Sequence, residues 1–512
     1  MTAKIDISPE QLAIVQVLLK DHLPNGTLAW AFGSRVTWTA KPFSDLDIAL
    51  EGAEPLPSEV LIDLEEAFEA SDLPWKVDVI DLNAVSPEFR EIVERQRVPA
   101  DWRDLQLHEV GKIVTGKTPP TSNPDFYDGY IPFVTPSDMD GRRRIETTAR
   151  NLSADGAKKV GSSYVDRPAI SVSCIGSDMG KAALVDPPFV SNQQINSVIV
   201  SDDYDRLFIY YNLSARKEEI RNRAGGAAQP IMNKSDFGKL NIYAPFKPEQ
   251  TRISNILGTL DDKIELNRRM NETLEAMARA VFRDWFVDFG PTRRKAAGTA
   301  DPAAILGGLL PDPTQAAPLA ALFPDSFGAN GLPEGWEERE VGSFAKLKGG
   351  KQLPKTEFVE DGDIPVFGGA GLMGNTDKAN ASGYVISVGR VGAYCGNFVA
   401  HRGRAWINNN ASFFELENGT KPEWFFYALR ELDLTTIRKG AAQPFVSNSD
   451  IAKLSLVFPG DPVLETFHGI LLPLVQLIEA NEQENQTLAA TRDLLLPKLM
   501  SGELRLTGVE DL

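Results

Sequence analysis

The sequence predicts a multidomain α+β protein: a small α/β domain at the N-terminus, then two similar mixed α/β modules separated by two long antiparallel helices. Three observations indicate this architecture. A segment that begins at Gly226 is repeated from Gly440, a heptad pattern of apolar residues follows each copy, and aspartate-bearing strand patterns occur in residues 1–97. We therefore predict one unpaired domain and two modules related by internal duplication.

The duplication is readable without gaps. Gly226–Pro230 recurs as Gly440–Pro444, an offset of 214 residues (440 minus 226), and Ser235-Asp236 recurs at the same offset as Ser449-Asp450. Further upstream the spacing changes, because the echo of Asp128–Phe133 is Asp361–Val366. The two halves therefore share a framework and differ in the segments between its landmarks.

A heptad seam follows each copy of the repeat. Its positions, mostly apolar residues and asparagines, are spaced alternately four and three residues apart. This spacing is the pattern of a coiled-coil helix. The first seam is Ile253, Leu257, Leu260, Ile264, Asn267, Asn271, Leu274, Ala278 and Val281; the second is Phe467, Leu471, Leu474, Ile478, Asn481, Asn485, Leu488, Arg492 and Leu495. Two matching stripes are most economically buried against each other, and the repeated asparagines would fix register at some cost in stability.

Composition sets limits on the function. The net charge of −18 argues against nucleic acid at first sight, but residues 1–97 hold a net charge of −10, which leaves −8 for the rest. Arginines cluster locally in that remainder, and local patches decide binding more than the total does. Cys174 and Cys395 are isolated and predict neither a disulfide framework nor a cysteine metal site. Without an evident signal peptide or apolar span, we expect a cytoplasmic protein with no membrane partner.

The N-terminal domain begins with a helical pattern over residues 10–20. A short apolar strand, Leu28–Phe32, leads directly into Gly33-Ser34. After ten intervening residues, Asp45 and Asp47 begin a second strand. Side chains two residues apart on a strand face the same side, so these two carboxylates point together.

A third aspartate completes the pattern. Asp78 lies in the predicted strand Lys76–Ile80, which can pair beside the second strand. Clustered carboxylates repel one another unless a cation lies between them, and hard oxygen ligands suit Mg²⁺. Gly33 permits close approach of a phosphate and Ser34 can donate to it. Three solvated carboxylates at strand edges are the alternative.

This pattern, Gly33-Ser34 followed by Asp45, Asp47 and Asp78, resembles the minimal nucleotidyltransferases of the DNA polymerase beta superfamily, including antitoxin-like members. The resemblance covers about residues 1–97. It implies that Asp45, Asp47 and Asp78 are catalytic metal ligands and that Gly33 and Ser34 bind nucleotide, with Mg²⁺ and a nucleoside triphosphate as cofactors. Bulky Trp38 departs from the small residue common in the family and would narrow substrate access.

Two phosphate-binding patterns in the modules are better explained as glycine-rich turns. Gly111–Thr118 matches the P-loop pattern, but Pro119 and Pro120 follow where a helix must open. Gly369–Gly374 matches the dinucleotide-binding pattern, but the polar residues after it form no crossover helix. We predict no ATP or dinucleotide site here.

The domain boundaries follow from these landmarks. Residues 290–332 are rich in Ala, Pro and Gly and predict a linker. The predicted order is the N-terminal domain at 1–97, the first module at 101–246, the first long helix at 247–289, that linker, the second module at 333–459, and the second long helix at 460–502.

Two such modules, each ending in Gly-Ala-Ala-Gln-Pro and a long helix, resemble the specificity subunit of type I restriction-modification systems over residues 101–502; Thr115–Pro119 and Asn267–Leu274 are further points of likeness. The resemblance implies that each module is a target recognition domain for one half of a split site in double-stranded DNA. It also implies two DNA adenine methyltransferase subunits and ATP-dependent restriction motor subunits as partners. The specificity part itself would need no cofactor.

Arg, Asn and Gln are the side chains that most often read base edges. We list them as DNA-binding candidates: Arg142, Arg143, Arg144, Asn192, Gln193, Gln194, Arg221 and Gln229 in the first module, and Arg402, Arg404, Asn408, Asn409, Asn410, Arg438 and Gln443 in the second. For Gln229 and Gln443, a shared structural role in the repeated turn is the alternative.

Two other functions stay open on the sequence. The chain could be a nucleotidyltransferase that uses its remainder as a targeting scaffold, or a symmetric scaffold for partner proteins without DNA contact. Salt-sensitive binding to duplex DNA would exclude the scaffold.

Overall fold

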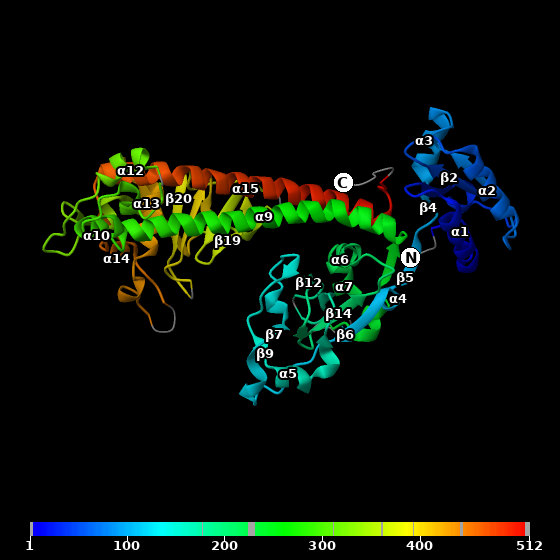
Figure 1. Ribbon diagram of the computed structural model, residues 1–512, viewed down its shortest axis with the longest axis horizontal. Helices are drawn as coiled ribbons and strands as arrows, with labels where there is room; N and C mark the ends of the chain where they lie inside the picture. The colour runs from blue at the N-terminus through cyan, green and yellow to red at the C-terminus, as the bar shows by residue number, and fades with distance from the viewer. Residues whose placement is uncertain are drawn as a thin grey trace. The chain divides into compact units, whose positions relative to one another are not determined.

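The computed structural model describes residues 4–176, 178–223, 231–310, 312–359, 362–392, 394–440 and 444–506. The chain divides into two compact units, one made of Met1–Leu266 with Glu484–Leu512 and the other of Asn267–Gln483. The first unit contains the N-terminal domain and the first module, and the second contains the second module (Figure 1). The predicted fold class is confirmed.

The N-terminal domain is a sheet with strand order β3-β2-β1-β4 and helices packed on it. Strands β1 and β2 are antiparallel, whereas β2 and β3 are parallel. Alternate residues of the two central strands, among them Ala29, Ala31, Ile48 and Leu50, are buried in one core. The elements are α1 (Pro9–His22), β1 (Leu28–Phe32), β2 (Leu46–Glu51), α2 (Ser58–Glu69), β3 (Val77–Asp81), α3 (Pro87–Gln96) and β4 (Val98–Pro99).

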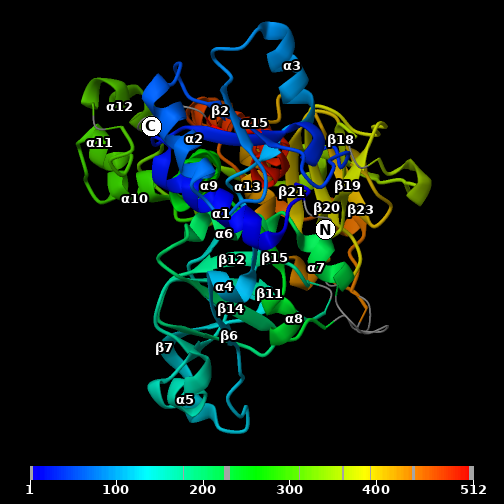
Figure 2. The same ribbon diagram turned by 90° about the vertical axis from the view of Figure 1, so that its right-hand side faces the viewer.

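The first module is built on the sheet β6-β14-β11-β12-β8, beside the sheet β10-β13-β7-β9 and the pair β15-β5. Figure 2 shows β6, β14 and β11 next to one another. Its strands are β5 (Arg103–Gln106), β6 (Gly111–Thr115), β7 (Tyr127–Val134), β8 (Arg144–Ile145), β9 (Asn151–Leu152), β10 (Tyr164–Val165), β11 (Ala169–Ser173), β12 (Ala182–Val185), β13 (Phe189–Ser191), β14 (Ile195–Val200) and β15 (Asn241–Ala244). Its helices are α4 (Leu107–Val110), α5 (Ala154–Lys159), α6 (Arg206–Ser214), α7 (Lys217–Arg223) and α8 (Lys234–Gly238).

The second module repeats this plan in shorter form, with sheets β17-β23-β20-β21, β19-β18-β22 and β16-β24. Part of the predicted linker is helical, as α10 (Gly290–Ala296), α11 (Pro302–Ile305) and α12 (Pro313–Ala320). The strands are β16 (Glu337–Glu340), β17 (Ala345–Gly349), β18 (Ile364–Gly368), β19 (Gly371–Thr376), β20 (Tyr384–Gly389), β21 (Phe398–Arg402), β22 (Trp406–Ile407), β23 (Ala411–Leu416) and β24 (Ser455–Phe458). The helices are α13 (Pro422–Arg430) and α14 (Asn448–Ala452).

The two modules share a backbone hydrogen-bond pattern. The Cys174 amide donates to the Gln194 carbonyl (2.7 Å), and the Arg390 amide donates to the Asn410 carbonyl (2.9 Å). The Cys174 carbonyl in turn accepts from Met232 (2.9 Å), just as the Arg390 carbonyl accepts from Val446 (3.0 Å). Cys174 and Arg390 are therefore equivalent, and the duplication visible in the sequence is a duplication of structure.

Two long helices close the modules, α9 (Lys247–Phe286) and α15 (Asp461–Ser501). Every predicted seam position on both helices is buried or half-buried. In the second unit α9 and α15 run side by side (Figure 1), and Phe467 of α15 packs on Phe282 and Phe286 of α9. In the first unit Arg492 of α15 pairs with Asp261 of α9 at 2.7 Å. Early residues of one helix meet late residues of the other, so the pairing is antiparallel, as predicted.

Helix α15 continues through Pro473. By length and composition alone α15 is also apolar enough to cross a membrane. In its most apolar stretch 22% of the residues are buried, and the buried residues of α15 include the seam positions Phe467 and Leu471.

The C-terminal segment is joined to the N-terminal domain within the first unit. The buried Arg505 guanidinium bonds to Asp101 (2.7 Å), to Glu249 (2.6 Å) and to the carbonyl of Ala29 on β1 (2.9 Å). It also lies over the rings of Trp30 and Trp102. One cation therefore connects β1, the start of the first module and the start of α9.

Candidate nucleic-acid interface and nucleotide site

Gly33 directly follows strand β1 of the N-terminal domain and lies against the Asp47 carboxylate. Gly33 has a φ of +75°, and a Cβ on it would lie 2.2 Å from the Asp47 Oδ2 atom. Any other residue would be strained in this left-handed conformation and would collide with the carboxylate. Glycine is therefore required for the backbone to approach Asp47 this closely.

The predicted aspartates come together at the edge where β2 and β3 begin. Asp47 and Asp78 are directly paired in the parallel register of these strands. Burial first, then the negative charges of Asp78 and Asp45, raise the pKa of Asp47 above its ordinary value. Each added negative charge makes ionisation of Asp47 harder, so the arrangement suits a bound cation in charge and in oxygen-donor chemistry.

The carboxylates are not gathered into a ready-made metal cage. Among the residues that the structure describes, no group of three or more His, Cys, Asp or Glu side chains is placed to hold a metal ion. Asp78 instead pairs with the Lys76 ammonium at 2.6 Å. The roles of Asp45, Asp47 and Asp78 as metal ligands, and of Gly33 and Ser34 as nucleotide ligands, stay predictions.

The loop after Ser34 contains two features of interest. Trp38 has a φ of +60°, a conformation that a bulky residue rarely adopts, and its side chain is about half exposed. Sequence reasoning missed Arg35, which is buried, donates to the carbonyls of Asp6 (2.8 Å) and Ser44 (3.0 Å) and stacks on Trp75. Its position directly after Gly33-Ser34 was the available signal. Arg35 therefore links the start of the loop that carries Trp38 to Ser44 at its far end and to Asp6 before α1.

The predicted amide triplets occupy equivalent turns in the two modules. Asn192, Gln193 and Gln194 connect β13 to β14, and Asn408, Asn409 and Asn410 connect β22 to β23. In both, the first residue is buried, the middle one is exposed and the third is half-buried. Asn192 bonds to Gln194 through both its side-chain atoms, at 3.0 Å each. The first residue therefore builds the turn, and the middle residue, Gln193 or Asn409, faces outward.

Several predicted basic candidates in the first module are held by acids of the same unit. Arg143 reaches α9, where it bonds to Asp262 and to the Gly258 carbonyl. Arg142 pairs with Asp140 at 3.5 Å and with Glu265 at 3.7 Å, and Arg144 pairs with Asp186 at 3.2 Å. Arg221 is exposed on α7. Arg143 thus has a structural role that the sequence did not predict.

Two predicted basic candidates in the second module are also held by contacts within their own unit. Arg402 bonds to the buried Glu423 and, at 2.7 Å, to Glu479, and it lies over the ring of Tyr384. Arg438 donates to the Cys395 carbonyl at 2.7 Å, whereas Arg404 is exposed. Gln229 and Gln443 lie outside the described residues. The contacts of all these side chains with DNA stay predictions.

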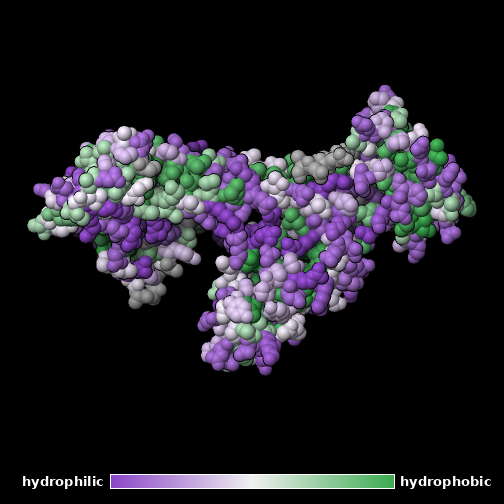
Figure 3. Space-filling view, viewed as in Figure 1, coloured by the Kyte–Doolittle hydropathy of each residue, from purple (hydrophilic) through white to green (hydrophobic). Residues whose placement is uncertain are grey.

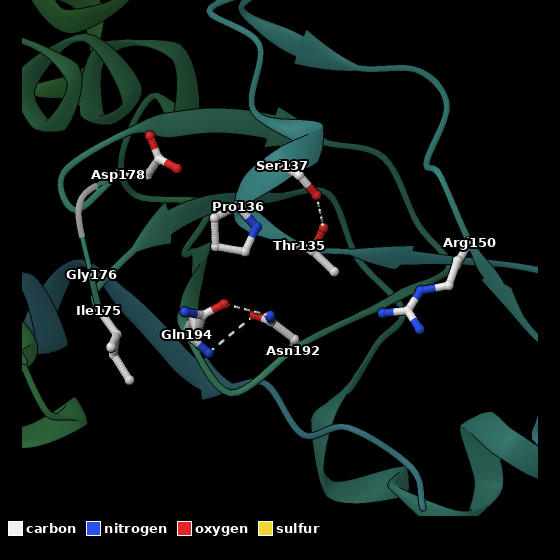
Figure 4. Close-up of a pocket in the computed structure, with 9 residues that line it drawn as sticks. All are labelled: Thr135, Pro136, Ser137, Arg150, Ile175, Gly176, Asp178, Asn192 and Gln194. Carbon is white, nitrogen blue, oxygen red and sulfur yellow. Dashed lines mark hydrogen bonds between the residues drawn. The ribbon is translucent and has the colours of Figure 1, made fainter. Parts of the chain in front are cut away.

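A polar cavity of about 450 Å³ opens beside the turn of the first module (Figure 4). Its lining includes the side chains of Thr135, Ser137, Arg150, Asp178, Asn192 and Gln194. The sequence had indicated only the last two. The face of this module visible in Figure 3 is mostly hydrophilic, in keeping with a polar ligand.

Neither nucleotide-like pattern of the modules forms a phosphate loop. Gly111–Thr115 is strand β6, and no helix opens at Gly116–Thr118. Gly371–Thr376 is strand β19, paired with β18 in a hairpin. Most of both patterns is therefore strand where the sequence predicted glycine-rich turns, and Gly369-Ala370 forms the turn of the hairpin.

Comparison with known proteins defines the class. Residues 99–276 and 333–490 match the family model described as "Type I restriction modification DNA specificity domain", and residues 14–98 match "Polymerase beta, Nucleotidyltransferase". The first match covers more than half of the chain. The chain therefore belongs to the type I restriction-modification specificity family, with a nucleotidyltransferase-like domain at its N-terminus.

Individual proteins are similar to most or to part of this chain. The chain is 25% identical over 451 residues to the type I restriction enzyme MjaIX specificity subunit of Methanocaldococcus jannaschii, covering 82% of this chain and 96% of that protein. Over 93 residues, 18% of this chain and 81% of the relative, it is 48% identical to the probable protein adenylyltransferase MntA of Haemophilus influenzae. A crystal structure of a type I restriction-modification S subunit from M. genitalium is 20% identical and covers 80% of this chain and 97% of that one, with a TM-score of 0.47.

Proposed function

We propose that this specificity subunit reads a bipartite site in double-stranded DNA, one half with each module, and docks two DNA adenine methyltransferase subunits and ATP-dependent restriction motor subunits. The observation that carries the proposal is the equivalence of the two modules, in which the same hydrogen-bonded turn presents Gln193 in one and Asn409 in the other. Two copies of one reading surface on a single chain suit two half-sites.

The antiparallel helices supply the second element of the proposal. Arg143 ties the first module to α9, and Arg402 ties the second module to α15 through Glu479. A module fixed to a helix in this way meets its half-site at a defined orientation. Nothing in the specificity part needs a cofactor for this role, because reading bases requires only hydrogen-bond donors, acceptors and apolar contacts.

The test is selection from a random duplex DNA library by the purified full-length chain, followed by sequencing. We expect enrichment of a split motif with a fixed spacer. Methylome sequencing of cells that express the chain with its methyltransferase should show the same motif methylated. Enrichment of no split motif, or of a continuous one, contradicts the proposal.

A second function is favoured for the N-terminal domain. We infer that it transfers a nucleotidyl group from a nucleoside triphosphate, because Gly33, Asp47 and Asp78 meet at one sheet edge and the domain is similar to a probable protein adenylyltransferase. Asp45, Asp47 and Asp78 would hold Mg²⁺, which supplies charge neutralisation on the phosphates when bound. Gly33 and Ser34 would bind those phosphates through the backbone and the hydroxyl.

The measurement is transfer of label from α-³²P-ATP, with Mg²⁺, to protein acceptors. Wild type should label an acceptor and Asp47→Asn should not. Asp63→Asn, an acidic residue of α2 outside the predicted site, serves as the matched control and should label as wild type does. Absence of labelling by wild type across acceptors would remove this function and leave the specificity function intact.

A further inference from the structure

The polar cavity of the first module combines hydrogen-bond donors and acceptors on facing walls (Figure 4). Thr135 and Ser137 contribute hydroxyls that bond to each other at 2.8 Å, and Gln194 contributes an amide from the reading turn. Such a mixed lining suits a neutral, planar, polar ligand. An apolar ligand would gain no hydrogen bond from these groups.

Arg150 and Asp178 are the charged side chains of the lining. Asp178 already pairs with Lys181 at 2.8 Å. The Arg150 guanidinium lies 5.8 Å from the ring centre of Tyr127 and 5.9 Å from that of Phe133, so two aromatic residues limit its movement. The carboxylate of Asp178 would repel a phosphate in the cavity, whereas a base edge carries no such charge.

Within the described residues of the second module, a different residue stands at the position of Arg150. In the paired strands Pro132 faces Asn151, and Pro365 faces Asn375, so Asn151 and Asn375 are equivalent. The residue before Asn375 is Gly374. A glycine therefore stands at the position that Arg150 occupies in the first module.

In the second module the side chain of Met373 occupies the place equivalent to the cavity. A Cβ on Gly368 would lie 2.4 Å from the Met373 sulfur, and the Asn408 amide nitrogen is 3.5 Å from the same atom. Gly368 corresponds to Thr135, because the Phe367 and Val134 carbonyls accept the equivalent bonds from Asn408 and Asn192. A thioether thus replaces the hydroxyls and guanidinium of the first module.

We propose that the cavity reads a guanine base in the DNA half-site of the first module, and that Arg150 is the residue that specifies it. The planar guanidinium fork matches the O6 and N7 acceptors of guanine in the major groove, which is the commonest specific contact of arginine with DNA. Gln193 and Gln194 lie on the adjoining turn for the neighbouring bases. The inference rests on the proposed DNA-recognition function and adds that the two half-sites are read by different chemistry at this position.

The test compares full-length variants in the random duplex library selection. Arg150→Gln removes the cation and the fork, and Arg150→Lys keeps the charge without the fork. Arg167→Gln is the matched control, because Arg167 is an exposed arginine of the same module that pairs with Asp202 at 3.3 Å outside the cavity. Circular dichroism and thermal unfolding establish that each variant is folded.

Wild type should enrich a guanine by roughly tenfold or more at one position of one half-site. Arg150→Gln should reduce this preference to near random at that position and leave the other half-site unchanged. Arg150→Lys should bind with similar affinity but weaker preference, and Arg167→Gln should keep the full motif. A wild-type motif that both Arg150 variants retain at every position overturns this inference alone. Failure of wild type to select any split motif overturns the proposed function as well.

Discussion

The side-chain amide of Asn481 on α15 donates to the side-chain oxygen of Asn271 on α9 at 2.8 Å. Asn271 in turn donates to the Ile478 carbonyl at 3.3 Å. Two polar residues at predicted seam positions therefore satisfy each other between the helices. A polar pair of this kind weakens the helix contact and selects one register.

Asn481→Leu alone should destabilise the chain, because it leaves the Asn271 oxygen without this donor; we expect a loss of about 1 to 2 kcal/mol. The double change Asn271→Leu with Asn481→Leu should recover that loss or exceed wild-type stability. Urea unfolding of the full chain measures both. Asn255→Ala, at an exposed position of α9, is the control and should change the unfolding free energy little. A double variant less stable than the single one would contradict the pairing.

Arg505→Met should be strongly destabilising. The guanidinium is fully buried against Asp101 and Glu249, and its removal leaves two carboxylates without their counter-charge. The expected loss is about 3 to 5 kcal/mol in the unfolding free energy of the unit that holds them. Thermal and urea unfolding provide the measurement. Arg95→Met, which breaks an exposed pair with Glu91, should cost well under 1 kcal/mol; equal effects of the two changes would refute the role of Arg505.

The raised pKa of Asp47 predicts a pH dependence of stability. A carboxyl whose pKa is higher in the folded state than in the unfolded state stabilises the fold at low pH, and that contribution is lost as pH rises through the folded pKa. Asp47→Asn should therefore stabilise the N-terminal domain at neutral pH, with no gain well below the ordinary pKa of 3.8. Thermal unfolding at the two pH values tests this. A stabilisation that persists unchanged in acid would show that the charge of Asp47 is not its cause.

Bound Mg²⁺ should stabilise the fold when the carboxylates are ionised. If Asp45, Asp47 and Asp78 hold the cation, millimolar Mg²⁺ should raise the unfolding temperature of wild type at neutral pH. Asp47→Asn should lose most of this shift. Asp63→Asn should keep it, and an equal shift in all three proteins would indicate a nonspecific salt effect.

Gly33→Ala should destabilise the fold through both backbone strain and a steric clash. The residue is left-handed, and the added Cβ would meet the Asp47 carboxylate. Gly298 is also left-handed, at a φ of +87°, but nothing lies near its Cβ position. Gly298→Ala should cost about 1 kcal/mol from conformation alone, and Gly33→Ala more than that. Urea unfolding measures both; label transfer should be lost in Gly33→Ala only.

The sequence predicted the structural features that come from an internal repeat or from a short-range residue pattern. The heptad spacing located both long helices and put Asn271 and Asn481 at seam positions, but their contact is seen only in the structure. Residue type alone selected Asn192–Gln194 and Asn408–Asn410, and the structure shows that they are equivalent. Spacing along strands likewise brought Asp47 and Asp78 to one edge.

The sequence did not predict contacts between segments that lie far apart along the chain. Arg143 was chosen for its charge, but its partner Asp262 lies 119 residues away, and no local pattern indicates that pair. Arg150 was missed because its place in the cavity depends on the pairing of β7 with β9, whose register is irregular. Basic residues were therefore recognised as a class, and the fold decided which of them are tied to acids.

The bond from Arg505 to the Ala29 carbonyl has a consequence for the order of assembly. The ribosome makes Arg505 476 residues after Ala29, so the site against Trp30 and Asp101 stays unfilled until translation has passed α15. Translation products that stop before this arginine would carry two buried acids, Asp101 and Glu249, without their counter-charge.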